Sequence, residues 1–213
     1  MKRQANSFTG QRPIFTGSVA IVPGGFNLDT EKQRFTENMV IPGGVCTIMD
    51  EKTRKVSVIK TAKVSAVDTD NQKIVTLHVD EFYAPIFCVG DRVAKDGSIS
   101  GTYAAAVTIE KIEQTDTTFV IYLSGAISGL KADDILVEVV SGNGGNAAVI
   151  GNSNCVTIGD IVVGKFETPV DVTADTMQYA LYERRVPPVS ASQKDSTGQF
   201  LKNNPHVKFT QSY

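Results

Sequence analysis

The sequence predicts an all-β protein: a small β-barrel or β-sandwich body, an extended N-terminal arm and a second β-rich segment at the C-terminus. Three observations lead to this prediction. Apolar and polar residues alternate along most of the chain, and helical spacing of apolar residues is scarce. Turn-forming residues also interrupt the alternating runs about every eight to twelve positions, as they do in sandwiches and barrels.

Composition divides the chain into three predicted parts: an arm over 1–36, the barrel or sandwich body over 37–141, and the β-rich segment over 142–213. Residues 1–18 are polar, contain glycine and proline, and are expected to supply no core face. The glycine- and asparagine-rich stretch 141–154 is typical of a long loop or a module boundary.

Within the body, the pattern predicts strands at 39–49, 55–67 and 73–79, the second of them as one long strand or two short ones. Residues 68–72, with the sequence DTDNQ, favour a turn, since Asp and Asn side chains bond their own backbone. The clearest hairpin spans 106–123, where two alternating runs flank Gln-Thr-Asp.

Two segments carry helical features. Residues 29–39 could form one or two helical turns capped by Asp29. In 176–186 strand and helix spacing both fit, and β-branched residues before it favour the strand. After Pro188 the tail is polar and is expected to be extended.

Pro42-Gly43-Gly44 raises the question of a phosphate-binding loop. Such a loop must hand its anion to a helix N-terminus, but strand-forming residues follow here, and no P-loop lysine is present. Proline fixes φ and glycine permits positive φ. The motif therefore predicts a turn that starts a strand.

Charge and hydropathy exclude several classes of protein. Twenty-one Lys and Arg against 23 Asp and Glu leave a net charge of −2, without the basic stripe that nucleic acid requires. No apolar run is long enough to cross a membrane, so we expect a soluble protein made in a cytosol. The three cysteines, Cys46, Cys88 and Cys155, are odd in number and widely spaced, which favours buried reduced thiols.

The sequence predicts no catalytic, cofactor or metal site. The two histidines, His78 and His206, lie far apart, and no nucleophile motif accompanies a cysteine. Asp68-Thr69-Asp70-Asn71 resembles part of a calcium loop but lacks the glycine and the terminal glutamate of an EF-hand. We therefore expect a solvated turn there, and a protein that is not an enzyme.

The runs VIPGGVCTIMDEKTRKVSVIKTAKV, FCVGDRV, TIEKIEQTDTTFVIYLSGAI and ADDILVEV, which together cover about 39–140, carry a family resemblance. A proline-glycine turn leads to a strand, a KTAKV strand follows, and an F-x-V-G-D turn precedes a hairpin. In this the chain resembles the head-decoration and head-fibre proteins of tailed bacteriophages, especially those of gut Bacteroidales phages related to the crAss-like group.

The resemblance implies a non-enzymatic structural protein of the virion that binds the outer capsid surface after synthesis in the host bacterial cytoplasm. Its implied partners are the major capsid protein and neighbouring copies of itself, in a homo-oligomer for which a trimer is one candidate. No cofactor, nucleic acid or membrane is implied. The arm would attach by adding a strand to a neighbouring sheet edge. The candidate contact residues are Arg12, Pro13, Ile14, Phe15, Val19 and Ile21. Removing residues 1–18 is accordingly expected to abolish attachment and leave a folded body.

Two alternatives stay open. A host-surface or glycan-binding fibre module would need an exposed aromatic patch, which without tryptophan must come from tyrosines. These are Tyr83, Tyr103, Tyr122, Tyr179 and Tyr182. A small β-barrel hydrolase, the weaker alternative, would need a cysteine or histidine beside a partner in a cleft.

Overall fold

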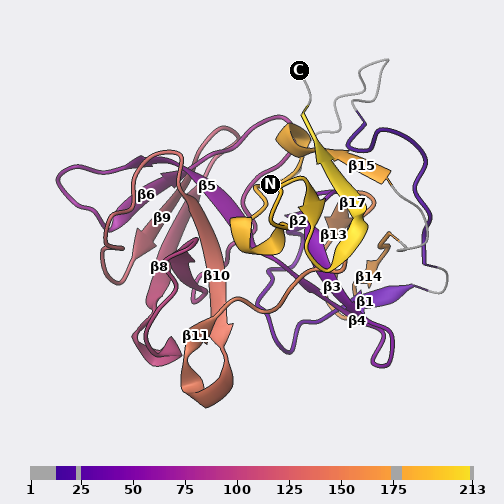
Figure 1. Ribbon diagram of the computed structural model, residues 1–213. Helices are drawn as coiled ribbons and strands as arrows, with labels where there is room; N and C mark the ends of the chain where they lie inside the picture. Colours follow the sequence, from indigo (N-terminus) through magenta and orange to yellow (C-terminus); the bar gives the residue numbers. More distant parts are fainter. Residues whose placement is uncertain (1–12, 23–24, 174–178, 212–213) are drawn as a thin grey trace.

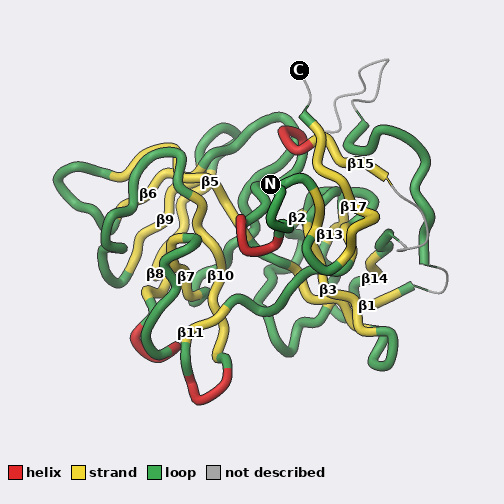
Figure 2. The backbone as a smooth tube through the Cα atoms, viewed as in Figure 1, coloured by secondary structure: helices red, strands yellow, loops and turns green. Residues whose placement is uncertain are grey.

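A computed structural model describes residues 13–22, 25–173 and 179–211 and confirms the all-β prediction. Figure 1 shows a barrel on one side of the molecule and smaller sheets on the other. Loops and turns join short strands, and the described helical segments are single 3-10 turns (Figure 2). They are η1 (Tyr103–Ala105), η2 (Asn143–Gly145), η3 (Glu183–Arg185) and η4 (Ala191–Gln193).

Six antiparallel strands form the closed barrel. Closure follows because one strand, β10, pairs with both β5 and β7. Around the barrel the strands are β10 (Ile135–Ser141), β5 (Thr61–Val67), β6 (Ile74–Leu77), β9 (Phe119–Leu123), β8 (Val107–Gln114) and β7 (Arg92–Lys95). The short β11 (Ala147–Ala148) pairs antiparallel with the C-terminal end of β10.

Alternation decides which side chains fill the barrel. In β6, Val75 and Leu77 are buried while their neighbours face outward, as the period of two predicts. The predicted hairpin at 106–123 is present as β8 and β9, and Phe119 and Ile121 point into the same core. Phe87, which lies in the loop between β6 and β7, also packs into this core.

A second sheet of five strands packs around its own core. In order they are β12 (Cys155–Val156), β3 (Cys46–Asp50), β4 (Lys55–Val58), β1 (Phe26–Leu28) and β14 (Pro169–Val170). The peptide N–H of Thr173 donates to Val156 O over 3.0 Å, and a bridge between Thr157 and Val172 links the two sheet edges. Beside it, β13 (Ile161–Val162) pairs with β2 (Val40–Ile41).

The three parts predicted from composition, divided at 36 and 141, contribute strands to one common sheet. One sheet joins β1 from the predicted arm, β3 and β4 from the predicted body, and β12 and β14 from the predicted C-terminal part. Because sheet pairing depends on contacts between residues far apart in sequence, composition along the chain does not reveal it.

The C-terminal sheet consists of β15 (Tyr179–Tyr182), β17 (Asn204–Thr210) and β16 (Phe200–Leu201). The strand preference in 176–186 is confirmed for β15, whereas 183–185 form η3 and 176–178 lie outside the described residues. The tail after Pro188 is more than an extended end, since Leu201, Val207 and Phe209 are buried in a third core cluster.

The predicted helix at 29–39 is wrong. These residues form turns, because tertiary bonds use the groups that a helix would need. The Asn38 N–H donates to Val163 O over 2.9 Å, and Arg34 O accepts a bond from Lys60 Nζ over 2.5 Å. The Gln33 side chain also accepts the Val58 N–H and donates to the Val58 carbonyl, both over 2.7 Å, at the end of β4. Asn38 has a φ of 64°, which interrupts helical geometry.

Candidate functional site

The N-terminal segment, defined here as residues 13–22, carries five of the six predicted contact residues, while Arg12 lies outside the described residues. Its first part adds a strand to β15: Tyr182 N–H donates to Ile14 O, and Thr16 N–H donates to Ala180 O, both over 2.9 Å. Pro13 is exposed, and its carbonyl accepts a bond from Arg185. The segment thus forms an isolated bridge with an edge strand of its own chain, and strand addition to a neighbouring molecule stays a prediction.

Phe15 is buried in the C-terminal core, with its ring 5.8 Å from that of Tyr179 in an edge-to-face arrangement. The expectation that residues 1–18 supply no core face is therefore wrong at Phe15. Ile14 and Val19 are half-buried against the same cluster. Ile21 pairs with Thr173 and is 53% exposed, so it faces solvent, as Pro13 does.

Three further large apolar side chains are exposed. Phe166 is 86% exposed on the loop between β13 and β14, and Val162 in β13 is 60% exposed. Val89, in the loop before β7, is 54% exposed. Phe166 and Val162 are four residues apart in sequence, and both leave most of the side chain exposed to solvent.

The Pro42-Gly43-Gly44 turn is confirmed as a turn that leads into β3. Its N–H groups are bonded within the chain: Gly43 donates to Asp160 Oδ1 over 2.9 Å and Gly44 to Thr157 O over 2.8 Å. The next N–H, that of Val45, donates to Thr157 Oγ1. These donors hold the β12–β13 connection and are not directed at an anion.

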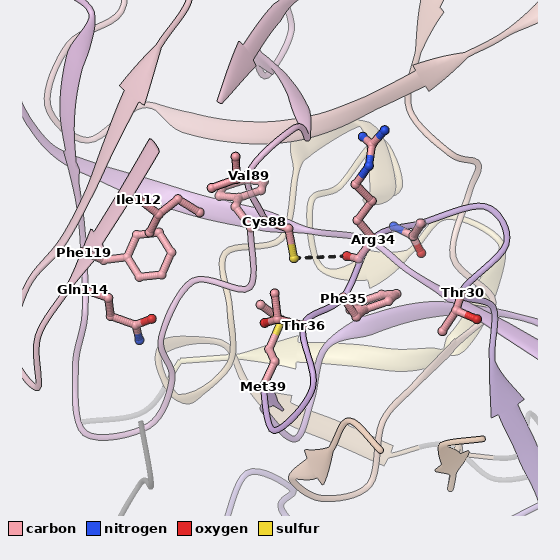
Figure 3. Close-up of a pocket in the computed structure, with 12 residues that line it drawn as sticks. Thr30, Arg34, Phe35, Thr36, Met39, Cys88, Val89, Ile112, Gln114 and Phe119 are labelled. Atoms are coloured by element: carbon pink, nitrogen blue, oxygen red, sulfur yellow. Dashed lines mark hydrogen bonds between the residues drawn. The ribbon is translucent and has the colours of Figure 1, made fainter. Parts of the chain in front are cut away.

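A pocket of about 580 Å³ lies between the end of the barrel and the 29–39 turns. Figure 3 shows Ile112, Gln114 and Phe119 on one side and Met39 and Thr36 facing them. Its wall is mainly apolar, and the side chain of Arg34 extends away from it. The Arg34 guanidinium instead donates to Gly90 O over 2.6 Å.

Behind the pocket wall lies a buried charge cluster of Lys60, Asp91 and Glu138. The Lys60 Nζ is 2.7 Å from Asp91 Oδ2 and 3.4 Å from Glu138 Oε1. The three side chains are 0%, 1% and 8% exposed. Charged groups are rarely buried to this degree unless they are paired.

The cluster is fixed by further hydrogen bonds. Lys60 Nζ donates to Arg34 O over 2.5 Å, and Gln33 Nε2 donates to Glu138 Oε2 over 2.5 Å. The Cys88 N–H donates to Asp91 Oδ2 over 2.8 Å. Burial raises the pKa of Glu138, with the Asp91 charge adding to this and Lys60 opposing it.

Sequence reasoning missed this cluster as a site, although two signals for it exist. Lys60 follows the apolar run VSVI, and Glu138 interrupts the apolar run ILVEVV. A charged residue within or directly after an apolar strand-forming run indicates a paired buried charge. Asp91 carries no such signal because Gly90-Asp91 is typical of an ordinary turn.

The cysteines are buried and free, as predicted. Burial raises the pKa of Cys46 to about 12 and that of Cys155 to about 11. It also raises the pKa of Cys88, whose thiol donates to Arg34 O. Since the thiolate is the nucleophilic form, these thiols are poor nucleophiles near neutral pH.

The 68–72 stretch forms the predicted turn, with Asp68 Oδ1 accepting the N–H groups of Asp70 and Asn71. Within the described ranges, no group of three or more His, Cys, Asp or Glu side chains is arranged to hold a metal ion. Over the same residues, the structure contains no helix with the length and apolar character of a membrane span.

Comparison of the chain with family models, with curated proteins and with solved structures finds no match. The fold and the site geometry therefore define the chain as an all-β protein with a closed six-strand barrel and a buried charge cluster.

Proposed function

We propose that this chain is a non-enzymatic structural protein of a tailed-phage virion, bound to the outer capsid surface as a decoration protein or the base of a head fibre. The observation that carries the proposal is Phe166, 86% exposed, with Val162 60% exposed four residues earlier. Burying such side chains on a partner stabilises a complex by about 1.5–3 kcal/mol each. The resemblance of 39–140 to head-decoration proteins implies that the partner is the major capsid protein.

The chemistry of the described residues supports a structural rather than a catalytic role. The cysteine thiols have raised pKa values, and the polar atoms of the Pro42-Gly43-Gly44 turn bond the chain itself. His78 is 3.6 Å from Asp80 on the surface, which is a solvent-exposed pair. The buried thiols pack in the core and the turn is bonded within the chain, which supports a structural role.

The glycan-binding alternative receives less support. Tyr83 and Tyr179 are buried, so they cannot contribute to an exposed aromatic patch. Of the other three tyrosines, Tyr122 donates its hydroxyl to Glu113, while the rings of Tyr103 and Tyr182 lie against arginine side chains.

Co-sedimentation with empty heads of the cognate phage tests the proposal. The full-length protein is expected to pellet with the heads, and Phe166→Ser to bind about tenfold more weakly, since about 1.4 kcal/mol corresponds to a factor of ten. Val89→Ser, which changes another exposed apolar residue, is the matched control and should bind as the unmodified protein does. A protein that stays in the supernatant at every concentration would overturn the proposal.

We further propose that the chain acts as a homo-oligomer, with a trimer as one candidate. Light scattering at increasing protein concentration tests this separately from capsid binding. An oligomer is expected to give an integer multiple of the chain mass. A monomer at every concentration would contradict an oligomer that forms before capsid binding.

A further inference from the structure

The three members of the buried charge cluster lie in or directly before three adjacent strands of the barrel. Glu138 is in β10, the strand between β5 and β7, and its N–H donates to Lys60 O over 3.0 Å. Lys60 immediately precedes β5, and Asp91 immediately precedes β7. Strand pairing therefore holds the Lys60 amine and the Asp91 carboxyl group on either side of the Glu138 carboxyl group.

The buried environment disfavours a cluster in which both carboxyl groups and the amine are charged. With all three groups charged, the site would hold one uncompensated negative charge away from water, which is costly. A proton on Glu138 makes the cluster neutral, and burial favours that form. The cluster then contains an amine donor, a carboxyl acceptor and a protonated acid, with the Phe35 ring 4.6 Å from Lys60 Nζ.

We propose that Lys60 and Asp91 condense into an intramolecular amide bond, with Glu138 transferring the protons. The amine nitrogen touches the carboxyl group, with Nζ 2.7 Å from Asp91 Oδ2. The bond would form between Nζ and Cγ, the carbon that carries Oδ2, and groups held together in this way can react as though at effective concentrations of about 10⁵–10⁸ M. Exclusion of water from the buried site disfavours hydrolysis of the product.

The two oxygens of Asp91 have different roles. Oδ2 accepts the Cys88 N–H over 2.8 Å, and this donor stabilises the negative charge that develops on Oδ2 during attack. Oδ1 is buried and, among the described residues, has no hydrogen-bond partner. Oδ1 is therefore the oxygen that leaves.

The reaction balances without an oxidant or a co-reactant. Glu138, whose Oε1 is 3.4 Å from Lys60 Nζ, turns its carboxyl group toward Asp91, donates its proton to Oδ1 and accepts one from the Lys60 ammonium, which leaves a neutral amine and a neutral acid. The Nζ lone pair forms the bond to Cγ. Nζ then gives up a second proton through Glu138 to Oδ1, the Cγ–Oδ1 bond breaks, and one water molecule leaves. Glu138 ends protonated, and Nζ keeps one hydrogen in the amide.

Mass spectrometry of the purified full-length protein tests the inference. The intact mass is expected to be lower than the sequence mass by one water molecule. Trypsin should fail to cut after Lys60, and the digest should contain a branched peptide in which the segment with Lys60 is joined to the segment with Asp91. The full sequence mass together with cleavage after Lys60, after prolonged incubation, would overturn the inference whatever the variants do.

Two matched variants test the role of Glu138. Glu138→Gln keeps the size of the side chain but cannot transfer protons, and it is expected to keep the full sequence mass. Glu113→Gln removes an exposed carboxylate on β8 and should lose one water molecule as the unmodified protein does. Water loss at an equal rate in Glu138→Gln would exclude Glu138 as the proton carrier. This inference is independent of capsid binding, because its readout needs only the isolated chain.

Discussion

At the scale of single residues, Gly44 shows why the turn before β3 requires glycine. Its φ is 80°, and an added Cβ would lie 2.2 Å from Val186 Cγ1. Gly44→Ala combines left-handed strain with overpacking and should destabilise the fold by about 2–4 kcal/mol in urea unfolding. Gly97→Ala is the matched control, because its φ is 75° but nothing lies within 4 Å of the added Cβ. It should cost about 1 kcal/mol, and equal losses would contradict the predicted clash with Val186.

Glu138 should also make stability depend on pH. Its pKa is raised in the folded state from an ordinary value of 4.5, mainly by burial. The folded protein therefore binds more protons than the unfolded chain, and its stability falls as pH rises from about that value through the raised pKa. Glu138→Gln should remove this fall. The check is the free energy of unfolding against pH for both proteins, and parallel curves above pH 4.5 would contradict it.

At the scale of elements, the N-terminal segment acts as part of the C-terminal sheet. Phe15→Ala should destabilise the protein by about 3 kcal/mol, as for a buried aromatic, and should lower the thermal midpoint. Thr16→Ala is the control, since its exposed side chain is dispensable and only its backbone bonds β15. An unchanged midpoint for Phe15→Ala would show that the segment does not pack as described.

The burial of Phe15 also changes the expected result of an N-terminal truncation. Removal of residues 1–18 was expected to leave a folded body, but it would delete Phe15 and the bonds to β15. Such a truncation is therefore expected to lower stability as well as attachment. A deletion that ends before Pro13 separates the two effects.

At the scale of the whole molecule, the proposed amide bond would connect positions 31 residues apart. Closing a loop of this length restricts the unfolded chain, and the entropic model developed for disulfides predicts about 4 kcal/mol of stabilisation. Urea unfolding should thus show the unmodified protein more stable than Glu138→Gln at a pH near 4.5, where the titration of Glu138 contributes least. Equal stability there would contradict a covalent link.

Local patterns predicted much of the architecture. Alternation in Val75 and Leu77, the turn at Asp68 and the hairpin of β8 and β9 all depend on neighbouring residues, and all are present. The helix predicted at 29–39 is absent because Asn38 N–H donates to Val163 O and Arg34 O accepts Lys60 Nζ, both partners being far along the chain. Local propensity does not include such a competing bond.

The sequence by itself determined the all-β class, the positions of most strands and turns, and the reduced state of the cysteines, because these follow from periodicity and composition. Only the tertiary structure decided the barrel closure by β10, the burial of Phe15 and the meeting of Lys60, Asp91 and Glu138. The physical reason is that strand pairing joins residues distant in sequence. Which buried charges become partners is set by that pairing alone.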